Sequence, residues 1–186
     1  MNLNIINPTD FLNFNESVRS LPDHSFFHTS NWAEVLQKSY HYQPVYFTIG
    51  ERAALQALLP VMEVNSFLTG KRGVSLPFTD YCEPAVSDAA QFREIFAAAV
   101  AFGRKHNWQY LELRGGETFF QNEEPSEYHY GHTLDLAKGP RKLFAGLRDS
   151  TRRNIKKAEK ERIDVAVSAS LDALKSFCRL NALTRR

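Results

Sequence analysis

RKLFAGLRDSTRRNIKKAEKER, residues 141–162, concentrates positive charge in one part of the chain. The segment contains nine basic and three acidic residues, a net charge of +6, whereas the whole chain of 186 residues carries +2. The remainder of the chain is therefore net acidic. Such a local concentration of positive charge attracts anionic ligands.

The spacing of side chains in this segment predicts a helix with two different faces. Mostly apolar residues recur at intervals of four, four and three, which aligns them along one side of a helix: Leu147, Thr151, Ile155 and Ala158. A row of cations runs beside them at intervals of four: Arg152, Lys156 and Lys160. Because Pro and Ser favour helix starts, we expect a short helix from Pro140, a break near Gly146 and a longer helix over 150–161.

The basic row has two interpretations. One is an ordinary solvated helix face, which is the usual role of a run of charges. The other is a phosphate-binding face, favoured by the scarcity of balancing carboxylates and by arginine, whose planar guanidinium matches phosphate oxygens. The candidate phosphate-binding residues are Arg148, Arg152, Arg153, Lys156 and Lys157.

Length and composition indicate one soluble globular domain, since 43% of residues are hydrophobic and fourteen are Phe. The two cysteines, Cys82 and Cys178, lie in no CxxC motif or Cys/His cluster, so we expect neither a disulfide framework nor a metal site. No segment has the run of apolar residues that crosses a membrane, and the first residues lack a basic leader. We therefore expect a cytoplasmic protein without stable membrane insertion.

Hydrophobic periodicity and turn residues predict alternating strands and helices. The expected strands are 2–6, 45–49, 54–64, 73–77, 108–114, 128–136 and 163–167. The expected helices are 8–21, one from about residue 29 to 40 with Trp32 in its buried stripe, 87–106, and a last helix capped by Ser168 or Ser170. That last helix reaches the end of the sequence without a cap, so we expect the chain to be a piece of a longer protein.

The segment SLPFTDYCEPAVSD, residues 75–88, is too chemically mixed for a plain connection. Asp80, Tyr81, Cys82 and Glu83 stand together after a predicted strand, where open sheets place their ligand crevices. The alternative is a turn with a buried Tyr and a small buried Cys. A nucleophilic role for Cys82 lacks a neighbouring histidine in sequence.

The order of these features resembles the FemAB-like aminoacyltransferases of the Gcn5-related acetyltransferase superfamily. The matching segments are HTSNWAEVL, SLPFTDYCEP, YLELRGG, HTLDL, LRDSTRRNIKKAEKERIDV and LTRR, which together cover most of the chain from about residue 26. The resemblance implies an α/β (α+β), GNAT-like acyl-CoA N-acyltransferase fold with a mixed, mostly antiparallel sheet flanked by helices. It also implies a first domain at 1–168 and, at 169–186, the start of a helix leading towards a second domain.

The resemblance further implies transfer of an acyl or aminoacyl group to an amine, often in modification of a peptidoglycan or cell-envelope precursor. Acetyl-CoA or aminoacyl-tRNA would serve as donor substrate, with no resident cofactor. The superfamily's pyrophosphate loop, Gln/Arg-x-x-Gly-x-Gly/Ala, is absent, and Arg114-Gly115-Gly116 is its nearest approach. The partners implied are charged tRNA, CoA or a nucleotide- or lipid-linked precursor, with a second domain, a second copy or peripheral contact with the inner membrane face as further options.

The residues leave the site assignment open. The candidates for substrate binding outside the basic row are Trp32, Asp80, Tyr81 and Arg114. The candidates for the base that takes the amine proton are Asp80, Glu83, Asp135 or a water molecule. Two other functions remain as alternatives: an RNA-binding module that uses the basic helix alone, and a non-catalytic half-domain that docks a partner through an apolar patch around Leu174, Phe177 and Leu183.

Overall fold

The computed structural model describes residues 2–51, 54–120, 123–132 and 134–185. The chain divides into two compact units, Met1–Pro125 (unit 1) and Ser126–Arg186 (unit 2). The expected division into a domain at 1–168 and a leading helix at 169–186 stays a prediction.

Unit 1 is built on seven described strands, which are β1 Leu3–Ile6, β2 Gln43–Pro44, β3 Tyr46–Glu51, β4 Ala54–Leu59, β5 Met62–Ser66, β6 Gly70–Val74 and β7 Leu111–Glu112. They form one sheet in the order β1-β3-β4 and another in the order β2-β5-β6-β7. Neighbouring strands are antiparallel except β6 and β7, which are parallel. The mixed, mostly antiparallel arrangement expected from the sequence is confirmed.

The two sheets share one long hairpin. β3 pairs with β4 and β2 pairs with β5, and between them the Val45 amide donates to the Val61 carbonyl at 2.8 Å. The strand expected over 54–64 is interrupted at Pro60, which has no N–H to donate to a ladder. At the other end of the hairpin, the register of the β3–β4 pair shifts at Gly50, which has φ +108°. The turn expected between these two strands includes Arg52, which lies outside the described residues.

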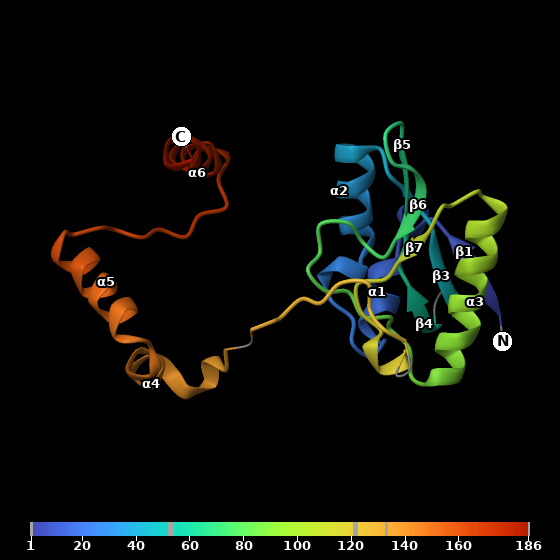
Figure 1. The fold of residues 1–186 in the computed structure, drawn as a ribbon, viewed down its shortest axis with the longest axis horizontal. Helices are drawn as coiled ribbons and strands as arrows, with labels where there is room; N and C mark the ends of the chain where they lie inside the picture. The colour runs from blue at the N-terminus through green and yellow to red at the C-terminus, as the bar shows by residue number, and fades with distance from the viewer. Residues whose placement is uncertain (1, 52–53, 121–122, 133, 186) are drawn as a thin grey trace. The chain divides into compact units, whose positions relative to one another are not determined.

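Three helices cover the sheets of unit 1. α1 (Phe14–Arg19) and α2 (Ser30–Tyr40) lie on one side of the strands and α3 (Ala89–Lys105) lies on the other (Figure 1). The single helix expected over 8–21 is wrong: a 3-10 turn at Pro8–Asp10 precedes α1, and Phe11 between them is extended. Short 3-10 turns also occur at Phe26–His28 and Glu117–Phe119.

Each side of the sheets has its own hydrophobic core. Tyr46 enters the cluster under α1 and α2, and its neighbour Phe47 enters the cluster under α3, because successive strand residues point to opposite faces. Phe92 and Ile95 supply the buried stripe of α3 to the second cluster. Asp88 caps α3 by accepting hydrogen bonds from two backbone N–H groups, one residue after the predicted start of the helix at residue 87.

Unit 2 consists of helices and extended connections within its described residues. The helices are α4 Gly139–Gly146, α5 Asp149–Lys160 and α6 Leu171–Thr184, after a 3-10 turn at Leu136–Lys138. The expected break near Gly146 and the Ser170 cap of α6 are confirmed, the latter by a bond of 3.2 Å from the Ala173 N–H to the Ser170 hydroxyl. None of the described residues of unit 2 is buried.

The two strands expected in this part of the chain are wrong. The described residues of 128–136 adopt no strand, and residue 133 lies outside the described ones. Residues 163–167 are likewise extended without pairing. Both segments have strand-like composition, but a strand exists only where a second strand accepts its hydrogen bonds, and within unit 2 the described residues supply none.

Candidate functional site

The parallel strands β6 and β7 end at the same edge of their sheet. Val74 of β6 pairs with Glu112 of β7, and the next amide, that of Ser75, donates to the Glu112 carbonyl at 2.8 Å. Two loops leave this edge together: 75–88 after β6 and 113–116 after β7. The carboxyl ends of parallel strands are where open sheets usually place a ligand, so we take the meeting of these loops as the candidate site and call it the loop junction.

Backbone groups and one guanidinium hold the loop junction together. The Cys82 N–H donates to the Arg114 carbonyl at 2.6 Å, and the Arg114 N–H donates to the Ser75 hydroxyl at 2.9 Å. The Arg114 side chain spans the same gap, since Nη1 donates to the Thr79 carbonyl at 2.7 Å and Nε donates to the Glu112 carboxylate at 2.7 Å. Arg114 was predicted as a substrate ligand, but these contacts give it a structural task at the site.

Glu83 and Tyr81 form the hydrogen-bonded pair of the loop junction. The Tyr81 hydroxyl donates to Glu83 Oε1, and the Gly116 N–H donates to Oε2 at 2.7 Å. The hydrogen bond to Glu83, with smaller contributions from burial and nearby carboxylates, raises the pKa of Tyr81 to about 12. Tyr81 is 63% exposed, so the expectation of a buried tyrosine here is wrong. Its hydroxyl stays protonated at neutral pH and within reach of solvent.

Two glycines allow the close approach of the loops. Gly115 has φ +152°, and a Cβ there would lie 2.8 Å from the Cys82 carbonyl oxygen. Gly116 has φ +83°, which places its N–H towards Glu83. Side chains rarely adopt such angles. The Gly-Gly pair that sequence analysis assigned to the end of a strand therefore also shapes the site.

Cys82 is not arranged as a nucleophile, although a histidine lies beside it. Its Sγ is 3.7 Å from His28 Nε2, a contact between residues 54 positions apart. Burial, with the charge of Glu83, raises the pKa of the Cys82 thiol to about 12. His28 Nε2 also lies 2.7 Å from the Glu83 carbonyl, which only accepts, so Nε2 carries the hydrogen and is not available as a base.

His28 is the residue of the site that sequence reasoning missed. It is 1% exposed, Nδ1 accepts from the Ser25 N–H at 3.0 Å, and burial lowers the pKa of its imidazole. The neutral ring thus ties the chain before α2 to the Glu83 backbone. The Ser25-x-x-His28 spacing of a capping box was the signal that could have found its local bonds, but nothing in the sequence indicated the long-range one.

The remaining predicted residues lie in different surroundings. Asp80 is exposed beside Tyr81. Trp32 is half-buried in α2 and packs on the rings of Phe26 and Phe27, with centroids at 6.0 and 5.3 Å, so its contacts are those of a core residue. Asp135 belongs to unit 2, where its carboxylate accepts the Ala137 N–H at 3.0 Å. The loop junction therefore brings together Asp80, Tyr81, Glu83 and Arg114, while the contacts of Trp32 and Asp135 lie elsewhere.

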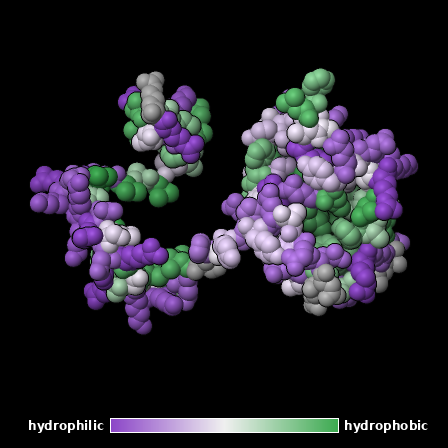
Figure 2. All heavy atoms as spheres, in the orientation of Figure 1, coloured by the Kyte–Doolittle hydropathy of each residue, from purple (hydrophilic) through white to green (hydrophobic). Residues whose placement is uncertain are grey.

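The basic row lies on α5, as the spacing predicted, and hydrophilic side chains gather over this helix (Figure 2). Arg152 Nη2 pairs with the Asp149 carboxylate and Nη1 donates to the Ala145 carbonyl at 3.2 Å. Lys157 Nζ lies 3.7 Å from Glu161 Oε1. Four of the candidate phosphate-binding side chains lie exposed on α5 or just before it, namely Arg148, Arg153, Lys156 and Lys157.

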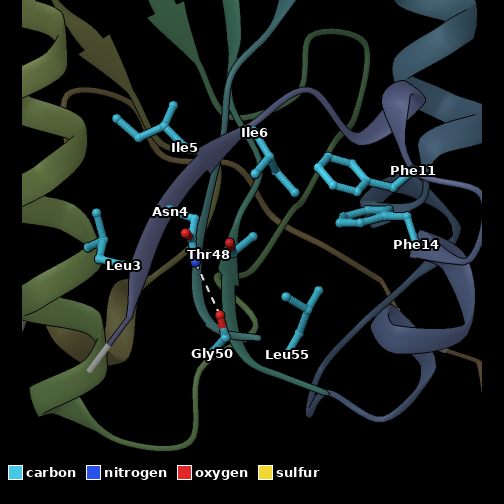
Figure 3. A pocket seen from close by; sticks show the side chains of 9 residues that line it. All are labelled: Leu3, Asn4, Ile5, Ile6, Phe11, Phe14, Thr48, Gly50 and Leu55. Carbon is cyan, nitrogen blue, oxygen red and sulfur yellow. Dashed lines mark hydrogen bonds between the residues drawn. The ribbon is translucent and has the colours of Figure 1, made fainter. Parts of the chain in front are cut away.

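A pocket of about 310 Å³ lies beside β1 (Figure 3), and none of the loop junction residues lines it. Phe11, Phe14 and Ile6 point towards one another on one side of the strand, and the Asn4 amide donates to the Gly50 carbonyl at 3.1 Å. None of the described residues that line it carries a titratable side chain. The pocket offers no acid–base chemistry, so we do not place the site there.

Two classes of site are not indicated by the described part of the chain. It contains no group of three or more His, Cys, Asp or Glu side chains placed to hold a metal ion. No helix among the described residues has both the length and the apolar character that crossing a bilayer requires.

Comparison with known proteins gives structural likenesses only. No family model matches the sequence, and no curated protein matches it. The structure is similar to a ribosomal-protein-alanine N-acetyltransferase from Brucella melitensis biovar Abortus 2308, with 11% identity, a TM-score of 0.44 and coverage of 72% of this chain and 98% of that one. It is also similar to FemX, with 15% identity and a TM-score of 0.33 over 57% of this chain and 24% of FemX. Both likenesses concern the fold, and at these scores neither carries an argument about activity.

Proposed function

We propose that this chain transfers an acyl or aminoacyl group to an amine, and that the loop junction is the reaction site. The observation that carries the proposal is the Tyr81–Glu83 pair, a carboxylate bound to a protonated hydroxyl at the carboxyl ends of the parallel strands β6 and β7. Bonds from the Gly116 N–H and the Arg114 side chain fix the surrounding loops. A site with two linked proton-transfer groups suits amine acylation.

The pair can complete a proton cycle. The amine attacks the carbonyl carbon of an ester or thioester, forming the C–N bond, and Glu83 takes the proton that the nitrogen loses. As the C–O or C–S bond breaks, Tyr81 gives its proton to the leaving oxygen or sulfur. Protonated Glu83 then returns a proton to Tyr81 through the hydrogen bond that joins them. The amine proton thus reaches the leaving group, and both side chains recover their starting states.

Phosphate on the substrate would be bound by the basic face of α5. Charged tRNA, CoA and nucleotide- or lipid-linked precursors all carry phosphates, which bind arginine and lysine through charge-assisted hydrogen bonds. Arg153 and Lys156 are exposed, whereas Arg152 would have to exchange its bond to Asp149 for one to the ligand. Modification of a peptidoglycan or other cell-envelope precursor, in the cytoplasm or at the inner membrane face, is the finer form of this proposal.

Ligand-dependent thermal stabilisation, followed by a transfer assay, tests the proposal. CoA, acetyl-CoA, charged tRNA and a nucleotide-linked peptidoglycan precursor are offered to the chain at low and moderate salt, and the ligand that stabilises it names the class of substrate. With a productive pair of substrates, Glu83→Gln keeps one of the two acceptor oxygens, which bind the Tyr81 hydroxyl and the Gly116 N–H, and removes the base. We therefore expect kcat to fall roughly a hundredfold to ten-thousandfold. Tyr130→Phe, an exposed tyrosine of unit 2, is the control. Turnover in Glu83→Gln equal to that of the wild type would refute the role of the pair.

RNA binding without catalysis is the second candidate, and the isolated basic face of α5 favours it. Under that function, affinity for RNA of any sequence falls steeply as salt rises, and no acyl donor is consumed. An Arg153→Ala/Lys156→Ala variant would lose RNA affinity under this candidate, and would lose precursor or CoA affinity under the first. Because charged tRNA is itself a possible donor under the first function, loss of RNA affinity alone does not separate the two. They are separated by whether an acyl donor is consumed.

Docking of a partner through α6 remains the third option. Leu174, Phe177 and Leu183 are all exposed, as the sequence predicted for an apolar patch. This option predicts association in solution that a Phe177→Ser variant abolishes. Sedimentation of the chain as a monomer at all concentrations would count against it.

A further inference from the structure

Three aromatic rings lie against one another where α2 ends and the turn after β6 begins. Tyr40 is the last residue of α2, Tyr42 precedes β2, and Phe78 belongs to the turn that follows Leu76. The Tyr40 and Phe78 centroids are 4.5 Å apart with 31° between the ring planes, and those of Tyr40 and Tyr42 are 5.5 Å apart at 22°. Tyr40 is 48% and Phe78 55% exposed. The Tyr40 and Tyr42 rings are stacked, and the Phe78 ring is tilted against Tyr40. Tyr40 and Phe78 reach the surface, whereas Tyr42 is half-buried.

Their arrangement differs from that of the aromatic cluster at the start of α2. There the rings of Phe26, Phe27 and Trp32 meet edge to face, at angles of 61 to 70°. Edge-to-face contacts interlock the rings with each other, whereas near-parallel rings leave a flat face on which another flat ring can stack. The Tyr40–Tyr42–Phe78 group, which we call the aromatic platform, therefore has the form of a stacking surface.

The backbone of Phe78 is strained although its side chain is not part of the buried core. Pro77 followed by a residue at φ +64° is the pattern of a type II turn, in which glycine is favoured at the second position. Leu76 also has a positive φ, of +57°, but it is fully buried and its side chain contributes to the core. Phe78 adopts the same unfavourable angle while half of its surface stays exposed. Strained residues of this kind concentrate at functional sites.

The platform adjoins the loop junction. The Thr79 hydroxyl donates to the Leu76 carbonyl at 2.7 Å, which closes the turn, and the Thr79 carbonyl accepts from Arg114 Nη1 at 2.7 Å. Phe78 is thus held next to a residue that Arg114 fixes at the reaction site. Tyr81 lies three residues further along the same loop.

We propose that the aromatic platform stacks the nucleobase of a nucleotide-bearing substrate. The inference rests on the proposed acyl transfer, because CoA, charged tRNA and nucleotide-linked precursors share one flat, uncharged group, the base. The platform carries no charged side chain, and its ring faces bind a base by stacking, which tolerates different bases. The hydroxyls of Tyr40 and Tyr42 are its polar groups. It identifies the nucleotide end of the substrate as the part recognised by unit 1.

Nucleotides with and without a base test the platform. Calorimetric titrations with adenosine monophosphate, uridine monophosphate and ribose 5-phosphate compare ligands that share a phosphate and differ in the ring. We expect both nucleotides to bind the wild type about tenfold more tightly than ribose 5-phosphate, the effect of one stacked base. In Phe78→Gly this advantage should disappear while ribose 5-phosphate affinity stays unchanged. Phe67→Ala, which changes a fully exposed phenylalanine of the same unit, should retain the advantage.

The same variant separates binding from folding. Glycine relieves the strain at φ +64°, so Phe78→Gly should unfold at or above the temperature of the wild type. Equal affinities of the wild type for nucleotides and ribose 5-phosphate would overturn the platform, as would a base advantage that survives in Phe78→Gly. A base advantage lost in Phe78→Gly, in a protein that transfers no acyl group from any donor, would support the platform and overturn the acyl transfer. Acyl transfer that depends on Glu83 but not on the nucleobase of the substrate would support the acyl transfer and overturn the platform.

Discussion

The helices of units 1 and 2 have similar apolar spacing and different surroundings. In α3 of unit 1, Phe92, Ile95 and Ala99 are buried against β3 and β4. In α6 of unit 2, Leu174 and Phe177 recur at a comparable interval and are exposed. Periodicity therefore predicts a helix and the residues that share its face, but a buried face also requires a partner that the local sequence does not specify. Each unit contains a cysteine, a leucine in a regular element and a glycine with positive φ. These three pairs of residues allow the surroundings in the two units to be compared by experiment.

The two cysteines should show the largest difference. Cys82 of unit 1 is 3% exposed, and burial with the charge of Glu83 raises the pKa of its thiol from 9.0 to about 12. Near neutral pH this leaves roughly a thousandfold less thiolate than an ordinary cysteine, and thiolate is the reactive form. Cys178 of unit 2 is exposed. Iodoacetamide should therefore modify one thiol per chain quickly and the second only after unfolding.

A Cys178→Ser variant is the control for this prediction. It leaves Cys82 as the single thiol, and mass spectrometry should show almost no alkylation of the folded protein. Rapid alkylation of this variant under conditions where it remains folded would mean that Cys82 is exposed or ionised, and would reopen the nucleophilic role that its contacts with His28 argue against.

The leucines should differ in their effect on stability. Leu58 of β4 is fully buried, so Leu58→Ala removes buried methyl groups and leaves a cavity, at a cost of about 2–5 kcal/mol in the free energy of unfolding. Leu174→Ala shortens an exposed side chain of α6, and the free energy of unfolding should change by less than about 0.5 kcal/mol. Urea unfolding followed by circular dichroism measures both. A comparable loss in Leu174→Ala would show that α6 is covered in solution.

The local features of the fold were predictable from the sequence, because caps and turns act over a few residues. Ser170 caps α6 and Gly146 ends α4 as expected, and the hairpin of β3 and β4 formed where alternation placed it. Local predictions were wrong where a single residue prevents the structure that the surrounding pattern indicates. Pro60 interrupts a strand of apolar residues because it lacks the N–H that pairing needs.

The contacts of the candidate site were only partly predictable. The segment after β6 was identified from its mixed chemistry, whereas Gly115-Gly116 was predicted only as the end of a strand. The pairing of Glu83 with Gly116, and the approach of His28 to the Glu83 carbonyl, depend on the parallel register of β6 and β7 and on residues up to 55 positions apart. No spacing rule reaches so far. The strand expected over 128–136 failed for the related reason that pairing is not encoded in one strand alone.

The two glycines should show the smallest difference in unfolding free energy between the units, and the change at Gly115 lies in the loop junction. Gly115 of unit 1 and Gly139 of unit 2 both have positive φ, +152° and +76°. A Cβ at Gly115 would lie 2.8 Å from the Cys82 carbonyl, whereas the space around Gly139 is open within 4 Å. Gly139→Ala should cost about 1–3 kcal/mol, because φ +76° and ψ 158° lie in a backbone region that is nearly restricted to glycine. Gly115→Ala should cost more than Gly139→Ala, because the contact with the Cys82 carbonyl adds to the backbone strain.

Thermal unfolding of the two variants, with the wild type as reference, measures these costs, and the titration of Tyr81 reports the local consequence. Separation of the loops in Gly115→Ala would weaken the bond from Gly116 to Glu83 and disturb the Tyr81–Glu83 pair, so the pKa of Tyr81 should fall from about 12 towards its ordinary value of 10.0. Gly139→Ala should leave it unchanged. A Tyr81 pKa that stays near 12 in a destabilised Gly115→Ala protein would mean that the Tyr81–Glu83 pair forms without the approach of the 113–116 loop. The 113–116 loop would then support the fold near the pair without helping to form it.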